Sequence, residues 1–235
     1  MIRQLGSALP SAQAAQAAQS VRQRAIDSVA GRTVPRSWET LKRALDITIA
    51  STALVTLSPV IAAAALGIVC ASPGSPFFAQ ERVGKNGRRF NLYKLRTMVR
   101  GAHLYHDEMR AFNEVDGPVL KIRNDPRLHP IGKLLRRTSI DELPNLINVL
   151  RGEMSIVGPR PPLPAEVADC DEFARRRLTV KPGVTCLWQI SGRSSISFEE
   201  WMRLDNEYID TWSPLSDLAI VARTVPAVIF GEGAH

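Results

Sequence analysis

The sequence predicts an α+β protein, mainly helical. A re-entrant membrane hairpin helix is expected beside a small cytosolic domain that has a short β-hairpin and interfacial amphipathic helices. Three observations support this fold class. No charged residue occurs from Ile47 to Gln80. Two short apolar runs flank the turn sequence GKNG, as in a β-hairpin. Elsewhere apolar residues recur at helical spacing, and 235 residues with 45% hydrophobic content suffice for one sizeable core.

The first 35 residues are predicted to be disordered. They are rich in Ala, Gln, Ser and Arg, and they contain no apolar run of the kind a secretory signal needs. Such a composition has little to bury, so it does not offset the entropy of ordering the chain. The folded domain is therefore expected to comprise residues 36–235.

The apolar segment 46–72 is predicted to enter the membrane and return to the same side. It is about long enough to cross a bilayer, which takes roughly 20 apolar residues. Ser58-Pro59 falls near its middle, where Pro removes a backbone donor and favours a break. Basic residues flank both ends, so both ends favour the cytoplasm. These residues are Arg32, Arg36, Lys42 and Arg43 before it, and Arg82, Lys85, Arg88 and Arg89 after it. A kinked spanning helix is the alternative.

The rest of the chain is predicted to be a domain of one hairpin and several helices. The hairpin joins residues 76–80 to residues 89–95. Helices are expected near 98–113, 126–137, 139–150, 162–178 and 198–212. The last apolar segment, Leu215 to Phe230, contains Asp217, Arg223 and Pro226. It is therefore expected to lie on a membrane or on the core and not to span.

The charge balance favours anionic partners. Thirty Lys and Arg residues against 23 Asp and Glu give a formal charge of +7. Nucleic acid, phospholipid headgroups and phosphorylated small molecules are all compatible with this balance. Three cysteines lie far apart without CxxC spacing, which favours free thiols over a zinc site.

Asp141 and Glu142 are adjacent carboxylates expected in the first turn of a helix, because Pro144 is tolerated only there. A structural interpretation makes them caps, since Ser139 and Glu142 have capping-box spacing. A functional interpretation makes Asp141 a nucleophile toward phosphorus, kept ionised by the helix end and neighbouring arginines. Glu142 would then bind Mg²⁺, which a pyrophosphate substrate brings with it.

Two arginines near the carboxylates are suited to phosphate. Arg136 and Arg160 present planar guanidinium groups that bind phosphate oxygens in pairs. Pro159, Pro161 and Pro162 restrict the backbone around Arg160, so little entropy is lost when Arg160 engages a ligand.

Five segments together resemble the bacterial sugar transferase family, the monotopic phosphoglycosyl transferases. They are KRALDI…LSP, FAQERVGKNGRRFNLYKLRTM, LLRRTSIDELPNLINVLRGEMSIVGPRP, VKPGVTCLWQISGR and RLDNEYIDTWSPLSDLAIVARTVPAV. The resemblance runs from about Trp38 to the C-terminus. The chain is similar to the minimal catalytic form of the family. Longer members carry an additional multi-span N-terminal region, and residues 1–35 are unmatched.

The resemblance implies an undecaprenyl-phosphate sugar phosphotransferase. Such an enzyme starts exopolysaccharide, O-antigen or glycoprotein glycan synthesis, as a monotopic protein on the cytoplasmic face of the bacterial inner membrane. Asp141 matches the aspartate that attacks the sugar-bearing phosphate of a UDP-sugar and expels UMP. A polyprenyl phosphate then takes the phosphosugar from the enzyme. Glu142 matches the residue associated with Mg²⁺, and the Ser58-Pro59 break matches the re-entrant hairpin of the family.

The resemblance also implies the substrate-binding residues. Lys94, Arg136 and Arg160 are expected around the diphosphate, Arg193 on the nucleotide side, and Asp205 at a further substrate position. Cys186 stands where many members have Gly, which affects the local turn and not the chemistry. The sugar, glucose or galactose phosphate, is left open, and so is the oligomeric state, a homodimer included.

Two alternatives remain at this stage. A membrane-attached protein that binds nucleic acid or anionic lipid without catalysis is compatible with the charge. However, only 6% of the residues are aromatic and the arginines cluster near carboxylates, so nucleic acid is not an expected partner. A second alternative keeps the enzyme but makes Asp141 a base or metal ligand, with direct transfer to the lipid phosphate.

Overall fold

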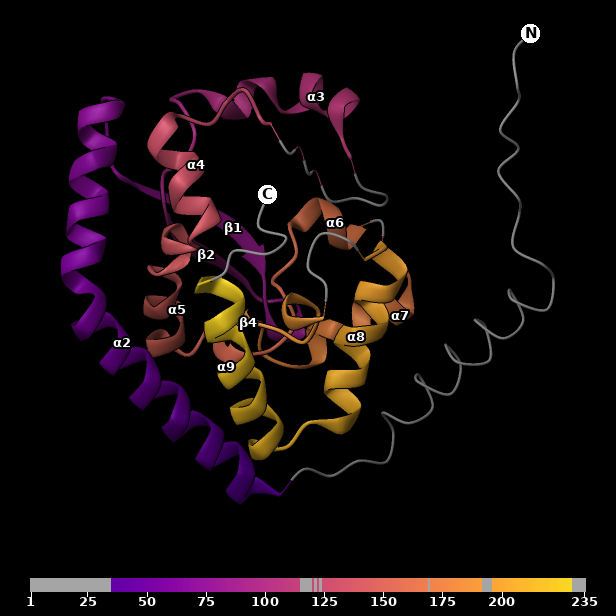
Figure 1. The fold of residues 1–235 in the computed structure, drawn as a ribbon. Coiled ribbons are helices and arrows are strands. Elements are labelled where there is room, and N and C mark those ends of the chain that lie inside the picture. Colours follow the sequence, from indigo (N-terminus) through magenta and orange to yellow (C-terminus); the bar gives the residue numbers. More distant parts are fainter. Residues whose placement is uncertain are drawn as a thin grey trace, which may run out of the picture. The chain divides into compact units, whose positions relative to one another are not determined.

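The computed structural model describes residues 35–114, 120, 122, 124–168, 170–191 and 196–229. The predicted disordered segment, apart from Pro35, and the candidate Arg193 lie outside the described residues. The described part is mainly helical and has two small two-stranded sheets (Figure 1). The coarse prediction of a mainly helical α+β fold is confirmed.

Helix α2 (Arg36–Ala71) contains nearly the whole predicted membrane segment and continues through Pro59. Figure 1 shows that this helix bends between its two halves. The expected break is therefore a bend within one helix, because the loss of one backbone donor leaves the neighbouring turns intact. Among the described helices, α2 is long and apolar enough to cross a membrane. Its outer side is apolar and open, with Val55 74% and Leu66 67% exposed.

The inner side of α2 packs along the rest of the domain at both ends. In the N-terminal half, Ala50 is fully buried in the main core cluster with residues of β3, α5 and α8. In the C-terminal half, Ile68 is fully buried against Leu95 and Leu135. Arg96 also donates hydrogen bonds to the carbonyls just beyond the end of the helix. Both ends of the apolar helix thus contact the same body.

The predicted hairpin is confirmed. Strands β1 (Phe77–Val83) and β2 (Arg89–Leu95) pair antiparallel, with Phe77 opposite Leu95 and Val83 opposite Arg89. The connecting turn contains Asn86 with φ 57° and Gly87 with φ 75°. This left-handed backbone is favoured by the Asn-Gly pair in the GKNG sequence.

Most of the predicted helices are found, but those expected over 98–113, 139–150 and 162–178 are divided. The short elements after β2 are η2 (Ala102–Tyr105), α3 (His106–Met109), η3 (Arg110–Phe112), α4 (Pro130–Arg137), η4 (Ile140–Glu142) and α5 (Asn145–Arg151). After β3 come the short elements α6 (Pro164–Ala168), α7 (Glu172–Arg175), η5 (Arg176–Thr179) and η6 (Trp188–Ile190). They are followed by two longer helices, α8 (Phe198–Thr211) and α9 (Pro214–Ile229).

The prediction of one helix over 162–178 is wrong. The proline cluster delays the start to Pro164. Asp171 then accepts a hydrogen bond from the Ala174 backbone, which caps a new helix. The predicted helix over 98–113 is likewise a series of short helical turns.

A second sheet brings two loops of the chain together. Strands β3 (Ser155–Val157) and β4 (Gly183–Thr185) pair in parallel, with Ser155 opposite Gly183. A Cβ on Gly183, the first residue of β4, would lie 2.1 Å from the backbone nitrogen of Gly158, the residue after β3, so only glycine fits there. The Pro-Arg-Pro turn after β3 therefore lies directly beside β4.

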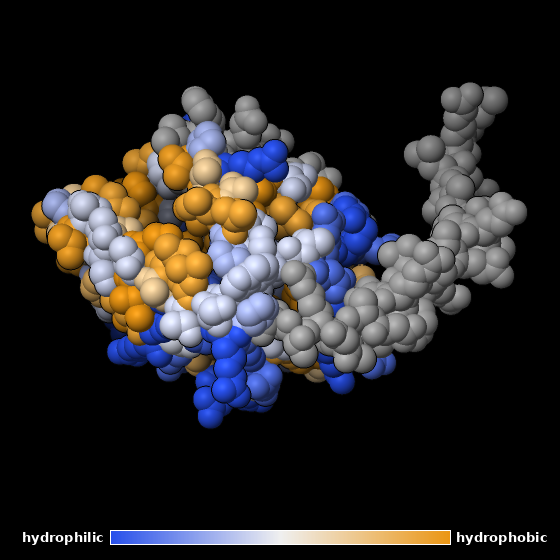
Figure 2. All heavy atoms as spheres, turned by 90° about the horizontal axis from the view of Figure 1, so that it is seen from below, coloured by the Kyte–Doolittle hydropathy of each residue, from blue (hydrophilic) through white to orange (hydrophobic). Residues whose placement is uncertain are grey.

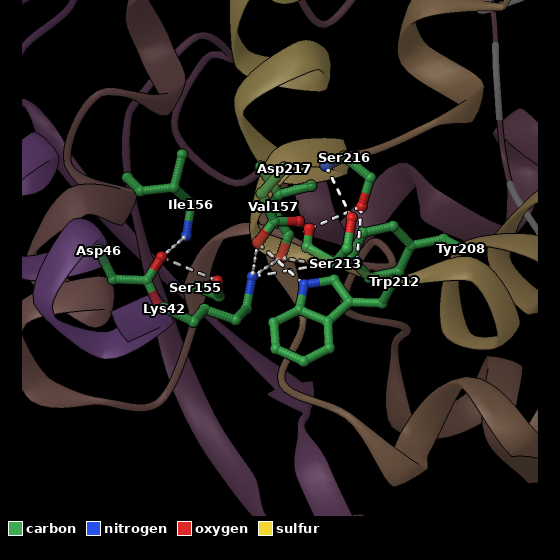
Figure 3. A network of polar contacts seen from close by, with 10 residues as sticks. All are labelled: Lys42, Asp46, Ser155, Ile156, Val157, Tyr208, Trp212, Ser213, Ser216 and Asp217. Atoms are coloured by element: carbon green, nitrogen blue, oxygen red, sulfur yellow. Dashed lines mark hydrogen bonds and ion pairs between the residues drawn. The ribbon is translucent and has the colours of Figure 1, made fainter. Parts of the chain in front are cut away.

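A buried polar network fastens α2 to β3 and to the last two helices (Figure 3). Asp217 of α9 accepts hydrogen bonds from Lys42 Nζ at 2.5 Å, Tyr208 Oη at 2.9 Å and Trp212 Nε1 at 3.0 Å. One turn further along α2, Asp46 accepts from the backbone and hydroxyl groups at the start of β3.

Hydrophobic side chains gather on one side of the domain surface. Figure 2 shows them mainly at the left, the side on which α2 lies in Figure 1. Among the described side chains of α9, the large hydrophobic ones that are exposed are Leu215, Leu218 and Val225. Exposed apolar groups of this extent mark a surface that contacts lipid or protein.

Candidate active site

The two candidate carboxylates lie in a short 3₁₀ turn that precedes helix α5. The turn is closed by hydrogen bonds from Glu142 N to Ser139 O and from Leu143 N to Ile140 O, both 3.2 Å. Helix α5 begins only at Asn145, with Pro144 as its N-cap residue. The prediction that both carboxylates lie in the first turn of the α-helix is therefore wrong.

The alternative interpretation of Ser139 and Glu142 as a capping box is also wrong. Ser139 has a left-handed backbone with φ 54°, and its side chain makes no capping hydrogen bond within the described part of the chain. The turn presents Asp141 and Glu142 at the junction of η4 with strand β2 and helix α4. The carboxylates are thus placed for contacts with neighbouring elements and do not serve as helix caps.

A cavity of about 100 Å³ lies beside this turn. Charged and amide side chains line one part of it, namely Arg82, Lys94, Glu142, Asn145, Arg160 and Gln189. The remaining wall is formed by Leu92, Met154, Pro161, Gly183, Val184, Cys186 and Trp188. The cavity therefore joins β1, β2, η4 and the loops after β3 and β4, segments far apart in the sequence.

Glu142 is held by a short ion pair with Lys94, 2.6 Å between Oε1 and Nζ. Burial alone would raise the pKa of Glu142, but the charge and hydrogen bond of Lys94, together with Arg160 and Arg82, lower it. Glu142 is thus an ionised carboxylate in a cationic setting. The predicted residues Lys94, Arg160 and Glu142 come together at this cavity.

Asp141 is buried, and its surroundings shift its pKa in the direction opposite to the one that the sequence suggests. Burial and the neighbouring charge of Glu142 raise the pKa of Asp141 to about 6, although Lys94 and Arg136 oppose the shift. The sequence suggests that the helix end and neighbouring arginines keep this carboxyl ionised, but burial and Glu142 are larger influences on its pKa and act in the opposite direction. A pKa of about 6 still leaves Asp141 mainly ionised at neutral pH, as a nucleophile requires.

Arg136 lies on the Asp141 side of the turn and outside the cavity lining. Its Nε donates to Thr97 Oγ1 at 3.1 Å. Burial lowers the pKa of Arg136, while the charges of Asp141 and Asp125 raise it. Asp125 itself pairs with Arg127 at 2.6 Å. The carboxylate pair thus has Lys94, Arg82 and Arg160 on the cavity side and Arg136 on the side of α4.

Arg160 is supported from behind by an aromatic ring. Its guanidinium carbon lies 5.5 Å from the ring centre of Trp201, and that of Arg177 lies 5.3 Å from the same ring. Arg177 also donates to the backbone carbonyl of Arg160. Such cation–π contacts hold a guanidinium without neutralising it.

The candidate Asp205 lies in this supporting layer and not at the cavity. Its side chain is fully buried, with Oδ2 3.1 Å from Arg177 Nη2. Burial raises the pKa of Asp205 to about 6, against the charges of Arg177 and Arg160. In the described structure Asp205 is therefore placed to hold Arg177, which in turn holds the backbone of Arg160.

Several cavity residues were missed by sequence reasoning, namely Arg82, Asn145, Trp188 and Gln189. For Arg82, the register of the hairpin would have indicated a place near the cavity. Since Phe78 is opposite Lys94 and Arg82 opposite Phe90, Arg82 and Lys94 share one face of the hairpin. The others depend on tertiary packing, and no local pattern marks them.

The donor set at the cavity fits Mg²⁺. Within the described ranges no three His, Cys, Asp or Glu residues converge as a complete metal site. Glu142, however, shares the cavity with Asn145, whose buried Oδ1 has no hydrogen-bond partner among the described residues. Mg²⁺ is usually bound by one or two protein oxygens plus substrate phosphates and water, so this pair suffices.

Comparisons with known proteins identify the family of this chain. A family model described as "Bacterial sugar transferase" matches residues 37–231. The chain is 43% identical over 194 residues to the galactosyl transferase CpsE of Streptococcus agalactiae, covering 82% of this chain and 43% of that protein. It is 41% identical over 199 residues to the exopolysaccharide production protein ExoY of Sinorhizobium fredii, covering 83% and 88%.

A third relative has a more specific name. The chain is 40% identical over 217 residues to the UDP-glucose:undecaprenyl-phosphate glucose-1-phosphate transferase of Caulobacter vibrioides, covering 87% of this chain and 76% of that protein. The chain thus spans less than half of CpsE but most of the other two relatives. Because the family match includes α2, the carboxylate turn, the cavity and α9, this chain belongs to the bacterial sugar transferase family.

Proposed function

We propose that this protein transfers a sugar 1-phosphate from a UDP-sugar to a polyprenyl phosphate and releases UMP. The reaction would be the first membrane step of exopolysaccharide or related glycan synthesis. The relative from Caulobacter vibrioides is named for this type of transfer. The observation that carries the proposal is the placement of an ionisable pair, Asp141 and Glu142, beside a cavity lined by Lys94, Arg82 and Arg160.

The proposed reaction has two displacement steps at one phosphorus atom. In the first, a carboxylate oxygen of Asp141 attacks the sugar-bearing phosphorus, and the bond from that phosphorus to the bridging oxygen breaks. UMP leaves with the electron pair, and the phosphosugar stays on Asp141. In the second, an oxygen of polyprenyl phosphate attacks the same phosphorus and frees the Asp141 carboxylate. A covalent step of this kind suits two substrates that differ so strongly in solubility.

The cations of the cavity stabilise the charge that moves during the first step. Lys94 and Arg160 would lie against the diphosphate, where fixed positive charges favour the departure of UMP. Glu142 and Asn145 would hold Mg²⁺, which supplies further neutralisation of the phosphate oxygens. Lys94 also keeps Glu142 ionised and oriented through its ion pair.

The membrane attachment proposed here is monotopic, on the cytoplasmic side of the bacterial inner membrane. The N-terminal turns of α2 bind the domain through Lys42, which donates to Val157 O at 3.0 Å, and Arg43, which donates to Val149 O at 2.6 Å. The other end packs through Ile68 on β2 and α4. A helix fastened to one body at both ends favours re-entry over crossing, while its open apolar side enters the lipid.

Accessibility tags at residues 30 and 85 are expected to report the same side of the membrane. Both positions flank α2, and the two flanks carry the basic residues that favour the cytoplasm. The measurement is labelling of single cysteines by an impermeant reagent in sealed vesicles of defined orientation. Labelling from opposite faces would contradict the monotopic arrangement and favour a spanning helix.

The covalent route is tested by adding a UDP-sugar in the absence of polyprenyl phosphate. We expect release of at most one UMP per active site, with the mass of one phosphosugar added to the peptide that contains Asp141. A panel of UDP-sugars, followed by UMP release, identifies the preferred sugar. Direct transfer to the lipid predicts neither UMP nor the added mass before the acceptor is present, so that result would refute the covalent mechanism.

A further inference from the structure

Arg82 is a buried cation at the cavity wall that has only neutral hydrogen-bond partners. It is 4% exposed. Its Nη1 donates to the carbonyl of Pro161 at 3.2 Å and its Nη2 donates to Gln80 Oε1 at 2.9 Å. Its Nε is buried and has no hydrogen-bond partner among the described residues.

The other buried arginines of the described chain are each paired with a carboxylate. Arg127 pairs with Asp125 and Arg177 with Asp205, and Arg176 pairs with Asp210. Arg82 makes no such ion pair within the described residues. The charges of Glu166 and Glu142 raise its pKa, but neither carboxylate forms an ion pair with it. An unpaired buried charge is costly, so the fold retains Arg82 at the cavity at the expense of stability.

Burial is the main cause of a lowered pKa of the Arg82 guanidinium. Together with the charge of Arg160 it lowers the pKa of Arg82 to about 9. The group remains positively charged at neutral pH, but its environment lacks the anion that would stabilise that charge. A bound anion is the simplest group to supply it.

The charges around the cavity match a diphosphate in sign. Three cations, Arg82, Lys94 and Arg160, line it, and Glu142 is the one carboxylate among the described lining residues. Two positive charges therefore remain after Glu142 is neutralised. The diphosphate of a nucleotide sugar carries two negative charges at neutral pH. The Mg²⁺ proposed at Glu142 would make the cavity more positive still, so an anionic nucleotide sugar is favoured there on electrostatic grounds.

Arg82 and Arg160 are held at a fixed separation before any ligand binds. Val83 N donates to Pro162 O at 2.9 Å, which joins strand β1 to the Pro-Arg-Pro turn. Arg82 itself donates to the carbonyl of Pro161 in that turn. Because both guanidinium groups are preorganised, little entropy is lost when they engage a phosphate.

We propose that Arg82 is a substrate-binding residue that contacts the diphosphate of the nucleotide sugar opposite Arg160, positioned by Gln80 and the carbonyl of Pro161. This inference rests on the proposed function, because it places the donor diphosphate in the same cavity. Both strands of the hairpin would then contact the diphosphate, β1 through Arg82 and β2 through Lys94.

The test measures binding of UDP and of inorganic pyrophosphate, each with Mg²⁺, by titration calorimetry on the full chain in detergent. The variants are Arg82→Met, Arg82→Lys and the control Arg89→Met, whose side chain is exposed on the same hairpin and pairs with Glu81. We expect the Kd of both ligands to rise at least about tenfold in Arg82→Met, since a charge-assisted contact is removed. A smaller rise is expected in Arg82→Lys, which keeps the charge but not the fork. The control should change by less than about twofold.

A separate readout distinguishes binding from a structural role. If Arg82 serves a ligand, the ligand-free Tm of Arg82→Met should stay within about 4 °C of the parent, because lost hydrogen bonds are offset by relief of the buried charge. A large drop in Tm with unchanged Kd would overturn the inference. If Arg82→Met does not fold, Arg82→Lys decides, and affinity equal to that of the parent protein overturns it.

Failure of the inference and failure of the proposed function give different results. A parent protein that releases UMP from a UDP-sugar, with Arg82 variants that bind UDP normally, refutes the inference alone. A parent protein that binds UDP through Arg82 but releases UMP from no UDP-sugar refutes the proposed function alone. A parent protein that binds neither UDP nor pyrophosphate overturns the Arg82 assignment.

Discussion

Replacing Asp141 with Asn is expected to reduce UMP release by at least about a thousandfold, because the amide cannot act as the nucleophile and the remaining groups only bind and orient the substrate. The change is nearly isosteric. It also removes one of two adjacent carboxylates, and burial together with the charge of Glu142 raises the pKa of Asp141 to about 6. The Tm of Asp141→Asn should therefore equal or exceed that of the parent protein. Rates are measured as UMP formed with saturating acceptor, alongside thermal unfolding.

The matched control for this substitution is Glu207→Gln, a carboxylate-to-amide change at an exposed ion pair with Arg203 on α8. It should leave both rate and Tm nearly unchanged. Full activity in Asp141→Asn would refute the assignment of Asp141 as the nucleophile. A partial loss that is restored by higher Mg²⁺ would instead assign Asp141 to metal binding, which is the direct-transfer alternative.

Local signals in the sequence were sufficient for some elements. The Asn-Gly turn between two apolar runs fixed the β1–β2 hairpin, since its left-handed residues suit that turn and few others. Helix α8 was predicted as 198–212 and is found at Phe198–Thr211, with Ser197 accepting a capping hydrogen bond from Glu200 N. In both cases residues adjacent in sequence supply the decisive contacts.

The turn that carries the candidate carboxylates could not be predicted in the same way. Residues 139–144 have the pattern of a helix start, yet Ser139 is left-handed and the α-helix begins at Asn145. The competing contact is the ion pair from Lys94 to Glu142, which joins positions 48 residues apart. A local pattern cannot weigh such a long-range contact against a cap.

The parallel pairing of β3 with β4 was missed for a related reason. Each strand has three residues, too few for an alternating pattern, and the pairing depends on two facing glycines, Gly158 and Gly183. This sheet brings Arg160 to the cavity. Sequence reasoning therefore identified Arg160 by its residue type and motif, but it could not place Trp201, Arg177 and Asp205 behind it.

The second large effect is expected at Asp217, where Asp217→Asn should destabilise the protein by about 3 kcal/mol, which corresponds to a fall in Tm of roughly 6–12 °C. The carboxylate accepts from three donors, Lys42, Tyr208 and Trp212 (Figure 3). An amide offers one acceptor oxygen, and its NH₂ group would face donors. Since Lys42 belongs to α2, the loss should loosen the attachment of the apolar helix to the domain.

A double-mutant cycle tests whether the ion pair between Lys42 and Asp217 attaches α2 to the domain. Lys42→Met and Asp217→Asn should each destabilise, while the double variant should be less destabilised than the sum by at least about 1 kcal/mol, because the second substitution removes a group already left unpaired. Glu200→Gln, which breaks an exposed ion pair with Arg203, serves as the control and should cost less than about 1 kcal/mol. Unfolding is followed in detergent by tryptophan fluorescence. Additive effects would mean that Lys42 and Asp217 act separately, and the attachment of α2 would then rest on its apolar packing around Ala50 and Ile68.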